Sequence, residues 1–414
     1  MQTFMGLVGI VVVLLLALLL SENRRAIRLR TVAGAFAIQA GLGMLVLYIP
    51  WGQRMLLAMT EGVQAVIDSA QAGMDFLFAG LVSDTMFEVF GDGGFVFALR
   101  VLPIIVFFSS LISVLYYLGI MRWVINLIGG ALHKVLHTSR TESLSAAANI
   151  FVGQTEAPIV VRPFLPSMTR SELFAVMVGG LASVAGSVLG GYAAMGISLE
   201  YLLAASFMAA PGGLLMAKMI VPEIRSESRV IEDVIDGDEG EQPANVIEAA
   251  SAGAAAGVQL AINVGGMLLA FISLIALVNA LLGWVGGWFG FEDITLQFLL
   301  GYVFSPLAFL IGVPWEEAML AGSYIGEKLI LNEFVAFADL AGDQHLLSAH
   351  AQAIVVFALC GFANLSSIAI LMGGLGLMAP NRRSEIARLG LKAVAAGTLS
   401  NLMSATLAGL FLSL

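Results

Sequence analysis

Polar residues that could bind a small molecule cluster in the stretch NIFVGQTEAP, residues 149–158, inside a very apolar sequence. Gln154 offers a hydrogen-bond donor and an acceptor, which suits the edge of a heterocyclic base, and Glu156 adds a carboxylate. A carboxylate within a bilayer costs about 3 kcal/mol or more unless it is paired or solvated, so its presence indicates a function. The alternative is that these side chains only satisfy the backbone of a turn.

Two further segments place polar side chains in apolar surroundings. Glu333, in ILNEFVAFADL, could accept two hydroxyl hydrogen bonds, as the vicinal diol of a ribose offers, or could be an interfacial charge that faces water. In CGFANLSSIAI, Asn364, Ser366 and Ser367 compete with helical hydrogen bonding, which predicts a local break that frees polar groups for a ligand. Phe362 could stack on that ligand or simply pack.

A hard cation such as sodium prefers oxygen ligands, which Asn149 and Ser183 could provide. Ser183 lies in GGLASVAGSVLGG, a small-residue helix that could equally serve only close packing. The four histidines show no metal-binding spacing, and Cys360 is the only cysteine. We therefore expect no Cys-based metal site, no intramolecular disulfide and no cofactor.

The composition is that of an integral membrane protein. Of 414 residues, 59% are hydrophobic and 12% are charged, and the mean hydropathy is +0.95. Apolar runs such as residues 6–20 approach the length of about 20 residues that crosses a bilayer as a helix, so we expect an all-α polytopic fold rather than a barrel. The net charge of −10 is concentrated in a solvated loop, residues 223–242, and predicts no anionic partner such as nucleic acid.

Clusters of Lys and Arg mark cytoplasmic loops and set the topology. The three clusters are Arg24, Arg25, Arg28 and Arg30, then Arg122, Lys134 and Arg140, and finally Arg382, Arg383, Arg388 and Lys392. We expect eight transmembrane helices, at about residues 6–20, 31–50, 94–120, 173–191, 201–220, 258–282, 351–378 and 389–414, with both termini outside. Amphipathic segments at residues 54–81 and 122–137 predict interfacial helices.

Two apolar segments are interrupted at their centres and predict re-entrant hairpins. Residues 143–166 are broken by a polar stretch, and each remaining arm is too short to span the membrane. Residues 298–330 are broken at GVPWEE, where the roles of Glu316 and Glu317 are left open. The first hairpin would enter from the cytoplasm and the second from outside. The order span, hairpin, span, span then occurs twice as an inverted repeat, which is typical of secondary transporters.

The segments GQTEAP, GVPWEEA, NEFVA and CGFANLSSIAI resemble signature segments of the concentrative nucleoside transporter family, particularly its bacterial sodium-coupled members. The resemblance covers nearly the whole chain and weakens only near residues 222–242, 286–297 and 340–350. It implies a homotrimer of eight-span protomers, in which a transport domain moves like an elevator against a trimeric scaffold.

The expected organisation of the chain combines the inverted repeat with this resemblance. It comprises residues 1–50 as N-terminal scaffold spans, 51–141 as interfacial helices and the third span, 142–220 as the first hairpin with spans four and five in the transport domain, 221–257 as an acidic cytoplasmic loop and linker, 258–293 as span six of the scaffold, and 294–414 as the second hairpin with spans seven and eight in the transport domain.

The resemblance also implies roles for single residues. The nucleobase would be faced by Gln154, Thr155 and Glu156 at the first tip and by Phe362. The ribose would be held by Glu333, Asn364 and Ser367. Sodium would lie between the first tip and an unwound part of span four, bound by the side chains of Asn149 and Ser183 and the backbone oxygens of Val152 and Val184. The second tip reads PWEEA where some relatives carry PWNEA, which leaves any role of Glu316 in doubt.

These features predict a sodium-coupled symporter that imports uridine-like nucleosides across a bacterial inner membrane, with both termini periplasmic. Its expected partners are the nucleoside, sodium, the lipid bilayer and the other copies of a homotrimer. Proton coupling and another small polar solute stay open as alternatives. A channel is a further alternative, and an intramembrane enzyme is disfavoured because no nucleophile and base pair or metal motif occurs. The preferred nucleoside and the sodium stoichiometry are left open.

Overall fold

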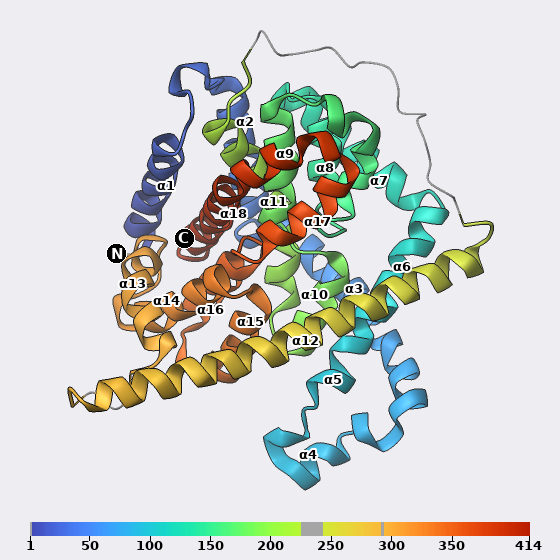
Figure 1. Ribbon diagram of the computed structural model, residues 1–414, viewed down its shortest axis with the longest axis vertical. Coiled ribbons are helices and arrows are strands. Elements are labelled where there is room, and N and C mark those ends of the chain that lie inside the picture. The colour runs from blue at the N-terminus through green and yellow to red at the C-terminus, as the bar shows by residue number, and fades with distance from the viewer. Residues whose placement is uncertain (1, 225–242, 291–293) are drawn as a thin grey trace.

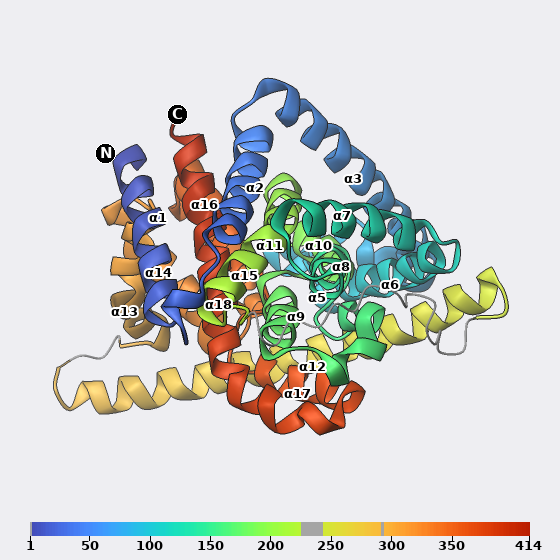
Figure 2. The ribbon, with the colours of Figure 1, turned by 90° about the horizontal axis from the view of Figure 1, so that it is seen from above.

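The computed structural model describes residues 2–224, 243–290 and 294–414, and every regular element in this part of the chain is a helix (Figure 1). The prediction of an all-α fold is therefore confirmed for these residues. Most of the predicted acidic loop, residues 225–242, lies outside the described residues. The two termini lie side by side, with the hydroxyl oxygens of Thr3 and Ser413 3.1 Å apart (Figure 2).

The N-terminal part supplies the first predicted spans and the amphipathic helices. Its helices are α1 (Gln2–Leu19), α2 (Leu29–Leu47), α3 (Pro50–Phe78), α4 (Thr85–Phe90), α5 (Phe97–Arg100), α6 (Leu102–Tyr117) and α7 (Ile120–Leu136). Helices α1, α2 and α6 coincide with the first three predicted spans. Helix α3 begins with Pro50, which is tolerated there because the first turn has no partner for its N–H. Helix α7 buries Ile125, Leu132 and Leu136 on one face, as its amphipathic pattern predicts.

The first predicted hairpin forms two short arms joined by turns. They are α8 (Arg140–Ala148) and the 3-10 helix η4 (Ala157–Ser167). Helix α8 begins with a capping box, in which Ser139 N donates to Glu142 Oε1 at 2.6 Å. The second arm contains Pro163 and Pro166, which lack the N–H groups that a regular α-helix needs. Neither arm has the length of a membrane span.

Predicted span four consists of two helices, α9 (Arg170–Ala182) and α10 (Gly186–Ala194), and residues 183–185 between them are not helical. The break lies where the family resemblance implies an unwound segment. Span five is α11 (Leu199–Ile220). These helices are almost completely buried inside the protein and form its centre.

Helix α12 (Val246–Gly287) is much longer than predicted span six. It begins at Val246, where Asn245 caps it by accepting Glu248 N at 2.9 Å, so residues 246–257, about the last third of the predicted loop and linker, are helical. Its 42 residues extend over about 63 Å, twice the thickness of a bilayer core, so α12 either is strongly tilted in a membrane or projects beyond it. It crosses the whole molecule and packs on α6, where Ser110 Oγ donates to Ala250 O at 2.8 Å (Figure 1).

The C-terminal part contains the second predicted hairpin and the last spans. Its helices are α13 (Leu296–Leu310), α14 (Trp315–Ile330), α15 (Glu333–Asp343), α16 (Ala349–Leu359), α17 (Ser367–Met378) and α18 (Arg383–Leu412). The axes of α13 and α14 turn by 117°, and Gly312 has a φ of +110°, which favours glycine at this turn. Predicted span seven is broken between α16 and α17, as the polar segment CGFANLSS predicts.

The N-terminal helices α1 and α2 pack against the buried helices rather than against α12. Gly9 of α1 lies against Thr406, and Gly43 of α2 lies against Met208 and Phe411, which belong to α11 and α18. The division into scaffold and transport parts stays a prediction, but these contacts favour moving α1 and α2 from the scaffold to the transport part.

The loop between α1 and α2 is held to the same helices by ion pairs. Glu22 Oε1 lies 2.9 Å from Arg170 Nη2 and 2.6 Å from Lys392 Nζ. The hydrogen bond from Arg170, with that from Lys392, lowers the pKa of Glu22 to about 2. The loop is thus bound to α9 and α18 through a carboxylate that stays ionised at neutral pH.

Glu22→Gln is expected to lower the free energy of unfolding by less than about 1 kcal/mol, because both cationic partners are partly exposed to solvent. Folding lowers the pKa of Glu22 from its ordinary value of 4.5 to about 2. The ion pairs of Glu22 therefore stabilise the folded protein fully above pH 4.5, and this stabilisation is lost as the pH falls towards 2. Thermal unfolding of both proteins across this pH range measures the difference. Glu61→Gln, on the exposed surface of α3, is the control, and a difference that does not shrink on acidification would contradict the prediction.

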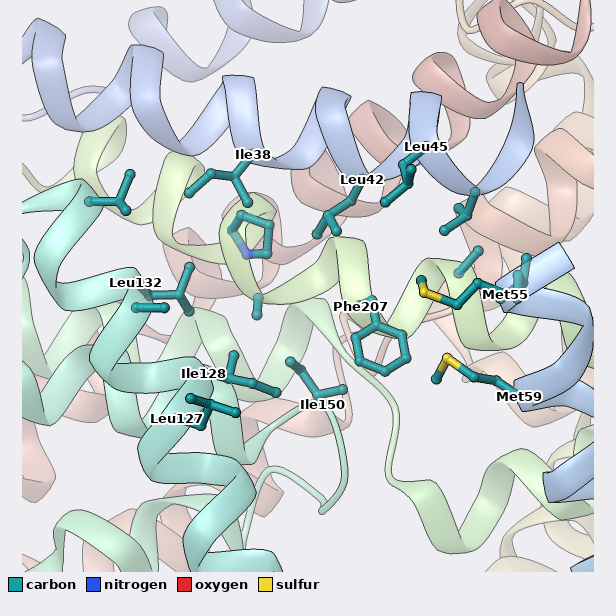
Figure 3. Close-up of a pocket in the computed structure, with 17 residues that line it drawn as sticks. Ile38, Leu42, Leu45, Met55, Met59, Leu127, Ile128, Leu132, Ile150 and Phe207 are labelled. Carbon is teal, nitrogen blue, oxygen red and sulfur yellow. The ribbon is translucent and has the colours of Figure 1, made fainter. Parts of the chain in front are cut away.

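An apolar cavity of about 450 Å³ lies between α2, α3, α7 and α11 (Figure 3). Its walls include Ile38 and Leu42 of α2, Leu132 of α7 and Phe207 of α11, and none of its lining side chains is charged. Because it offers no polar side chain, this cavity does not suit a nucleoside or an ion, both of which need hydrogen bonds or oxygen ligands.

Candidate functional site

A second cavity, of about 130 Å³, gathers all the residues predicted to bind the substrate. They come from three separate segments: the tip of the first hairpin, the first residue of α15, and the break between α16 and α17. The predicted residues in its wall are Gln154, Thr155, Glu156, Glu333, Phe362, Asn364 and Ser367. Apolar side chains from α10, α12 and α17 complete it, namely Val188, Leu260, Val264, Met267 and Ile370.

The tip of the first hairpin presents an amide and a carboxylate to this cavity. Gln154 is only 5% exposed, and its Nε2 donates to Ser367 Oγ at 3.4 Å, while its Oε1 has no partner among the described residues. Glu156 Oε2 accepts Gly153 N at 3.0 Å, so this carboxylate also closes the turn. The structural interpretation is therefore confirmed for Glu156, while the binding interpretation stays a prediction, supported by the unpartnered Gln154 Oε1.

Glu333 is buried, with 3% exposure, so its interpretation as an interfacial charge that faces water is wrong. Its Oε1 accepts Tyr192 OH at 3.2 Å and its Oε2 accepts Asn364 Nδ2 at 3.1 Å. Glu333 is also the first residue of α15, where the positive end of the helix dipole favours a carboxylate. Both oxygens keep further lone pairs, which suits two neighbouring hydroxyl groups.

The break between α16 and α17 is shaped by the side chain of Asn364. Its Oδ1 accepts Ser366 Oγ at 2.7 Å and Ser367 N at 2.9 Å, while its amide nitrogen holds Glu333. The predicted competition between side-chain and helical hydrogen bonds is thus confirmed at this position. Phe362 is half-buried and forms part of the cavity wall, where its ring is available for stacking.

Two residues near the site were not found from the sequence. Tyr192 is fully buried between Phe334 and Phe337, at ring distances of 4.8 and 4.5 Å, and its hydroxyl holds Glu333. Asn332 lines the cavity, and its Nδ2 has no partner among the described residues. The available signal for Tyr192 was a single hydroxyl in the apolar segment GGYAAMG, which needs a hydrogen-bond partner when buried.

Tyr192→Phe is expected to raise the KM for uridine, the substrate that the sequence predicts, by about tenfold, because Glu333 loses a hydrogen bond that orients its carboxylate. The ring contacts with Phe334 and Phe337 are retained, so the thermal stability should change little. Concentration-dependent uptake by purified protein in proteoliposomes measures the effect. Tyr302→Phe on the exposed surface of α13 is the matched control. A KM equal to that of the wild type would show that Tyr192 does not position Glu333.

The predicted sodium ligands gather where the first tip contacts the break between α9 and α10. Gly186 N donates to Phe151 O at 2.9 Å and joins the two segments. Asn149 Nδ2 donates to Ser145 O at 2.8 Å, which leaves Asn149 Oδ1 buried and without a partner among the described residues. Ser183 Oγ donates to Gly179 O at 3.0 Å and retains its acceptor capacity.

The backbone around this point supplies further oxygens. Val152 and Val184 are both buried outside regular helices, and no backbone N–H of the described chain donates to their carbonyl oxygens. The donor set therefore consists of neutral amide, hydroxyl and carbonyl oxygens, which fit a hard monovalent cation. The described residues contain no group of three or more His, Cys, Asp or Glu that could hold a metal ion. Ser183 is the C-cap that follows the last residue of α9, and it is buried, so the close-packing and the sodium-binding interpretations both stay open.

Glu316 and Glu317 do not line this second cavity. Glu317 Oε2 accepts Ser348 Oγ at 2.9 Å and Ser348 N at 3.1 Å, which ties the second hairpin to the start of α16. Glu316 is exposed at the N-terminus of α14, where the helix dipole favours its charge. One glutamate is therefore structural, and the other faces away from the protein interior.

Known proteins resemble this chain along its whole length. Family models match residues 8–81 and 201–409, described as the N-terminus and C-terminus of the Na+ dependent nucleoside transporter, and residues 98–199, described as nucleoside recognition. The nucleoside permease NupC of Helicobacter pylori is 54% identical over 418 residues, which covers 100% of this chain and 99% of the permease.

Solved structures of CNTnw have the same fold. A variant in an outward-facing state is 59% identical, with a TM-score of 0.97, and covers 100% of this chain and 99% of that one. An inward-facing, substrate-bound state is 60% identical, with a TM-score of 0.93, and covers 99% and 98% of the two chains. These relatives are transporters, so the protein is a transporter rather than an enzyme. The chain is a multi-pass membrane protein that belongs to the concentrative nucleoside transporter family, described by its models as Na+ dependent.

Proposed function

We propose that the protein is a symporter that couples the import of uridine-like nucleosides to sodium across the bacterial inner membrane. The observation that carries the proposal is the convergence of the hairpin tip, α15 and the broken helix on one cavity with polar side chains, beside buried oxygens of a kind that suits a cation. A nucleoside matches this cavity in its two chemically different parts. The ribose diol would donate to Glu333, and the base would bond with Gln154 and Glu156 and stack on Phe362.

Sodium coupling has a physical basis in the hairpin tip. Asn149 and Val152, which would bind the ion, lie in the same hairpin tip, residues 149–156, as Gln154 and Glu156, which would bind the base. An ion that binds Asn149 and Val152 of the tip and Ser183 of the broken helix would hold these two segments together. It would thereby order the base-binding groups of the tip. Such an ion would raise the affinity for nucleoside, and the nucleoside would raise the affinity for the ion by the same factor.

An elevator movement within a homotrimer is the transport mechanism that we propose. Helix α12 is apolar and mostly exposed, with Trp284 on its surface and the exposed Trp288 and Phe289 directly after its end, which suits a scaffold that contacts lipid or other protomers. The moving part would contain the two hairpins and the broken helices, entering from opposite sides in the inverted repeat of eight spans. Both termini would be periplasmic, in line with their adjacent positions. CNTnw adopts outward-facing and inward-facing states, which supports alternating access.

Uptake of labelled uridine by proteoliposomes tests the proposal. An inward sodium gradient should drive accumulation of uridine above its external concentration, and other nucleosides should compete. Equal uptake with a proton gradient in the absence of sodium would favour the proton-coupled alternative. Equilibration without accumulation under the sodium gradient would favour a channel. A lack of competition by any nucleoside would indicate another polar solute.

A further inference from the structure

The broken helices face each other in the centre of the protein. Helix α9 ends at Ala182 and α16 ends at Leu359, and Phe362 N donates to Ser183 O at 3.1 Å between the two breaks. The C-terminal end of a helix carries about half a negative charge and leaves carbonyl groups without intrahelical partners. Two such ends meet here in a buried environment, so a cation between them is favourable.

Asn401 of α18 joins these two helix ends. Its Nδ2 donates to Ala182 O at 2.6 Å and to Cys360 O at 2.9 Å. Gly361 allows this contact, because a side chain at its position would collide with the Asn401 amide. Both hydrogens of the Asn401 amide are used in these bonds. Its oxygen, Oδ1, remains free to accept a hydrogen bond from a third segment.

Lys328, in the last turn of α14, supplies the cation. Its Nζ donates to Asn401 Oδ1 at 2.7 Å and to Ala358 O at 3.2 Å, and the residue is 1% exposed. No carboxylate of the described chain lies within ion-pair distance of this nitrogen, and the charge of Glu333 acts on it only from a longer distance. The other buried lysine, Lys218, differs in this respect, since it pairs with Glu142 at 2.6 Å. The atoms that the Lys328 ammonium contacts directly are therefore an amide oxygen and a carbonyl oxygen, the same groups that bind sodium.

The break between α9 and α10 offers similar oxygens, and no Lys or Arg of the described residues donates to Asn149 or Ser183 there. There the amide oxygen of Asn149 is buried without a donor, whereas at the second break the amide oxygen of Asn401 is used by Lys328. Both places combine an asparagine amide with the carbonyl groups of a helix end. The two breaks thus differ mainly in the presence of the ammonium group.

We propose that the Lys328 ammonium is a built-in cation at the second helix break, which takes the place of a second sodium ion and limits each protomer to one sodium ion per nucleoside. The inference rests on the proposed function, because it specifies the stoichiometry of that symporter. Lys328 does not line the substrate cavity. It acts through Asn401 and the end of α16, and is a positioning residue.

The direct test measures the fluxes of radioactive sodium and labelled uridine together in proteoliposomes that contain the wild-type protein. One sodium ion per uridine is expected, with a Hill coefficient for sodium of about 1. Two sodium ions per uridine would overturn the inference, and this result does not depend on the folding of any variant. Absence of uridine uptake, or uptake that ignores sodium, would instead contradict the proposed function.

Two substitutions of Lys328 separate the effect of its charge from that of its volume. Lys328→Ala removes the ammonium and leaves space beside Asn401 Oδ1 and Ala358 O, so a sodium ion can enter and the Hill coefficient should rise towards 2. Lys328→Met fills the space without a charge, so uptake should fall by about tenfold or more while the Hill coefficient stays near 1. Lys392→Met, with a side chain that is 42% exposed, is the matched control and should keep the wild-type sodium dependence.

If Lys328 only stabilised the fold, its substitution would not change the Hill coefficient for sodium. The Hill coefficient therefore distinguishes a structural role from the replacement of a sodium ion. Wild-type uptake and sodium dependence in Lys328→Met would overturn the inference. So would an unchanged Hill coefficient in an active Lys328→Ala protein. Size-exclusion profiles and thermal unfolding establish whether each variant is folded, and if neither is, the flux ratio of the wild-type protein decides.

Discussion

Glu333→Gln is expected to reduce uridine uptake by about 100-fold or more. The carboxylate is buried, and each of its oxygens already accepts one hydrogen bond, from Tyr192 and from Asn364. In Gln, an NH2 group replaces one of these oxygens. This group cannot accept the hydrogen bond that the oxygen accepted, and it cannot accept a hydrogen bond from a hydroxyl group of the ribose. The effect is large because both the contact with the substrate and the hydrogen bonds within the protein are lost. The rate of uridine uptake in proteoliposomes measures it.

A comparison of uridine with 2′,3′-dideoxyuridine identifies the contact that is lost. The wild-type protein should strongly prefer uridine, because the dideoxy compound leaves the buried carboxylate without its hydroxyl partners. Glu333→Gln should lose most of this preference. Glu316→Gln, at an exposed position outside the cavity, is the matched control and should transport normally. A Glu333→Gln protein that retains the full preference for uridine would exclude Glu333 from the ribose site.

Asn149→Ala is expected to raise the KM for sodium by about 10- to 100-fold. The substitution removes a buried oxygen that has no partner among the described residues and therefore suits a cation. At saturating sodium the KM for uridine should change much less, because Gln154 and Glu156 remain in place. Uridine uptake at increasing sodium concentrations, with potassium used to keep the ionic strength constant, measures both values.

The control for this substitution is Asn381→Ala, which removes a similar amide from an exposed position in the loop before α18. Its sodium dependence should equal that of the wild-type protein. Thermal unfolding of Asn149→Ala with and without sodium gives a second readout, because an ion that binds the folded state stabilises it. Unchanged KM and unchanged stabilisation by sodium would remove Asn149 from the ion site.

The positions of the helix breaks could be predicted from the sequence because polar residues inside an apolar run have few alternatives in a membrane. The segments around Gln154 and Asn364 each interrupt such a run, and the structure places both beside one cavity. Helix α12 was predicted too short because its first turns contain many Ala and Gly residues and follow a charged loop. Small residues are compatible with a linker, and here they serve close packing on α6, which is a tertiary contact.

The partners of the buried polar groups could not be predicted. Tyr192 and Glu333 are 141 positions apart, and Lys328 and Asn401 are 73 positions apart. Hydropathy and spacing describe local structure, whereas these pairs depend on how the broken helices approach each other. For Glu333 the sequence left two interpretations open, and only its burial beside Tyr192 and Asn364 decided between them.

The sequence by itself determined the membrane class, the helical character, the interrupted segments and, through its motifs, the family. It could do so because a bilayer requires long apolar helices and penalises every polar interruption. Only the tertiary structure decided that the tip of the first hairpin, the N-terminus of α15 and the second break share one cavity. It also decided which buried oxygens stay free for a cation and which are taken by Lys328, because hydrogen-bond partners depend on the packing of distant segments.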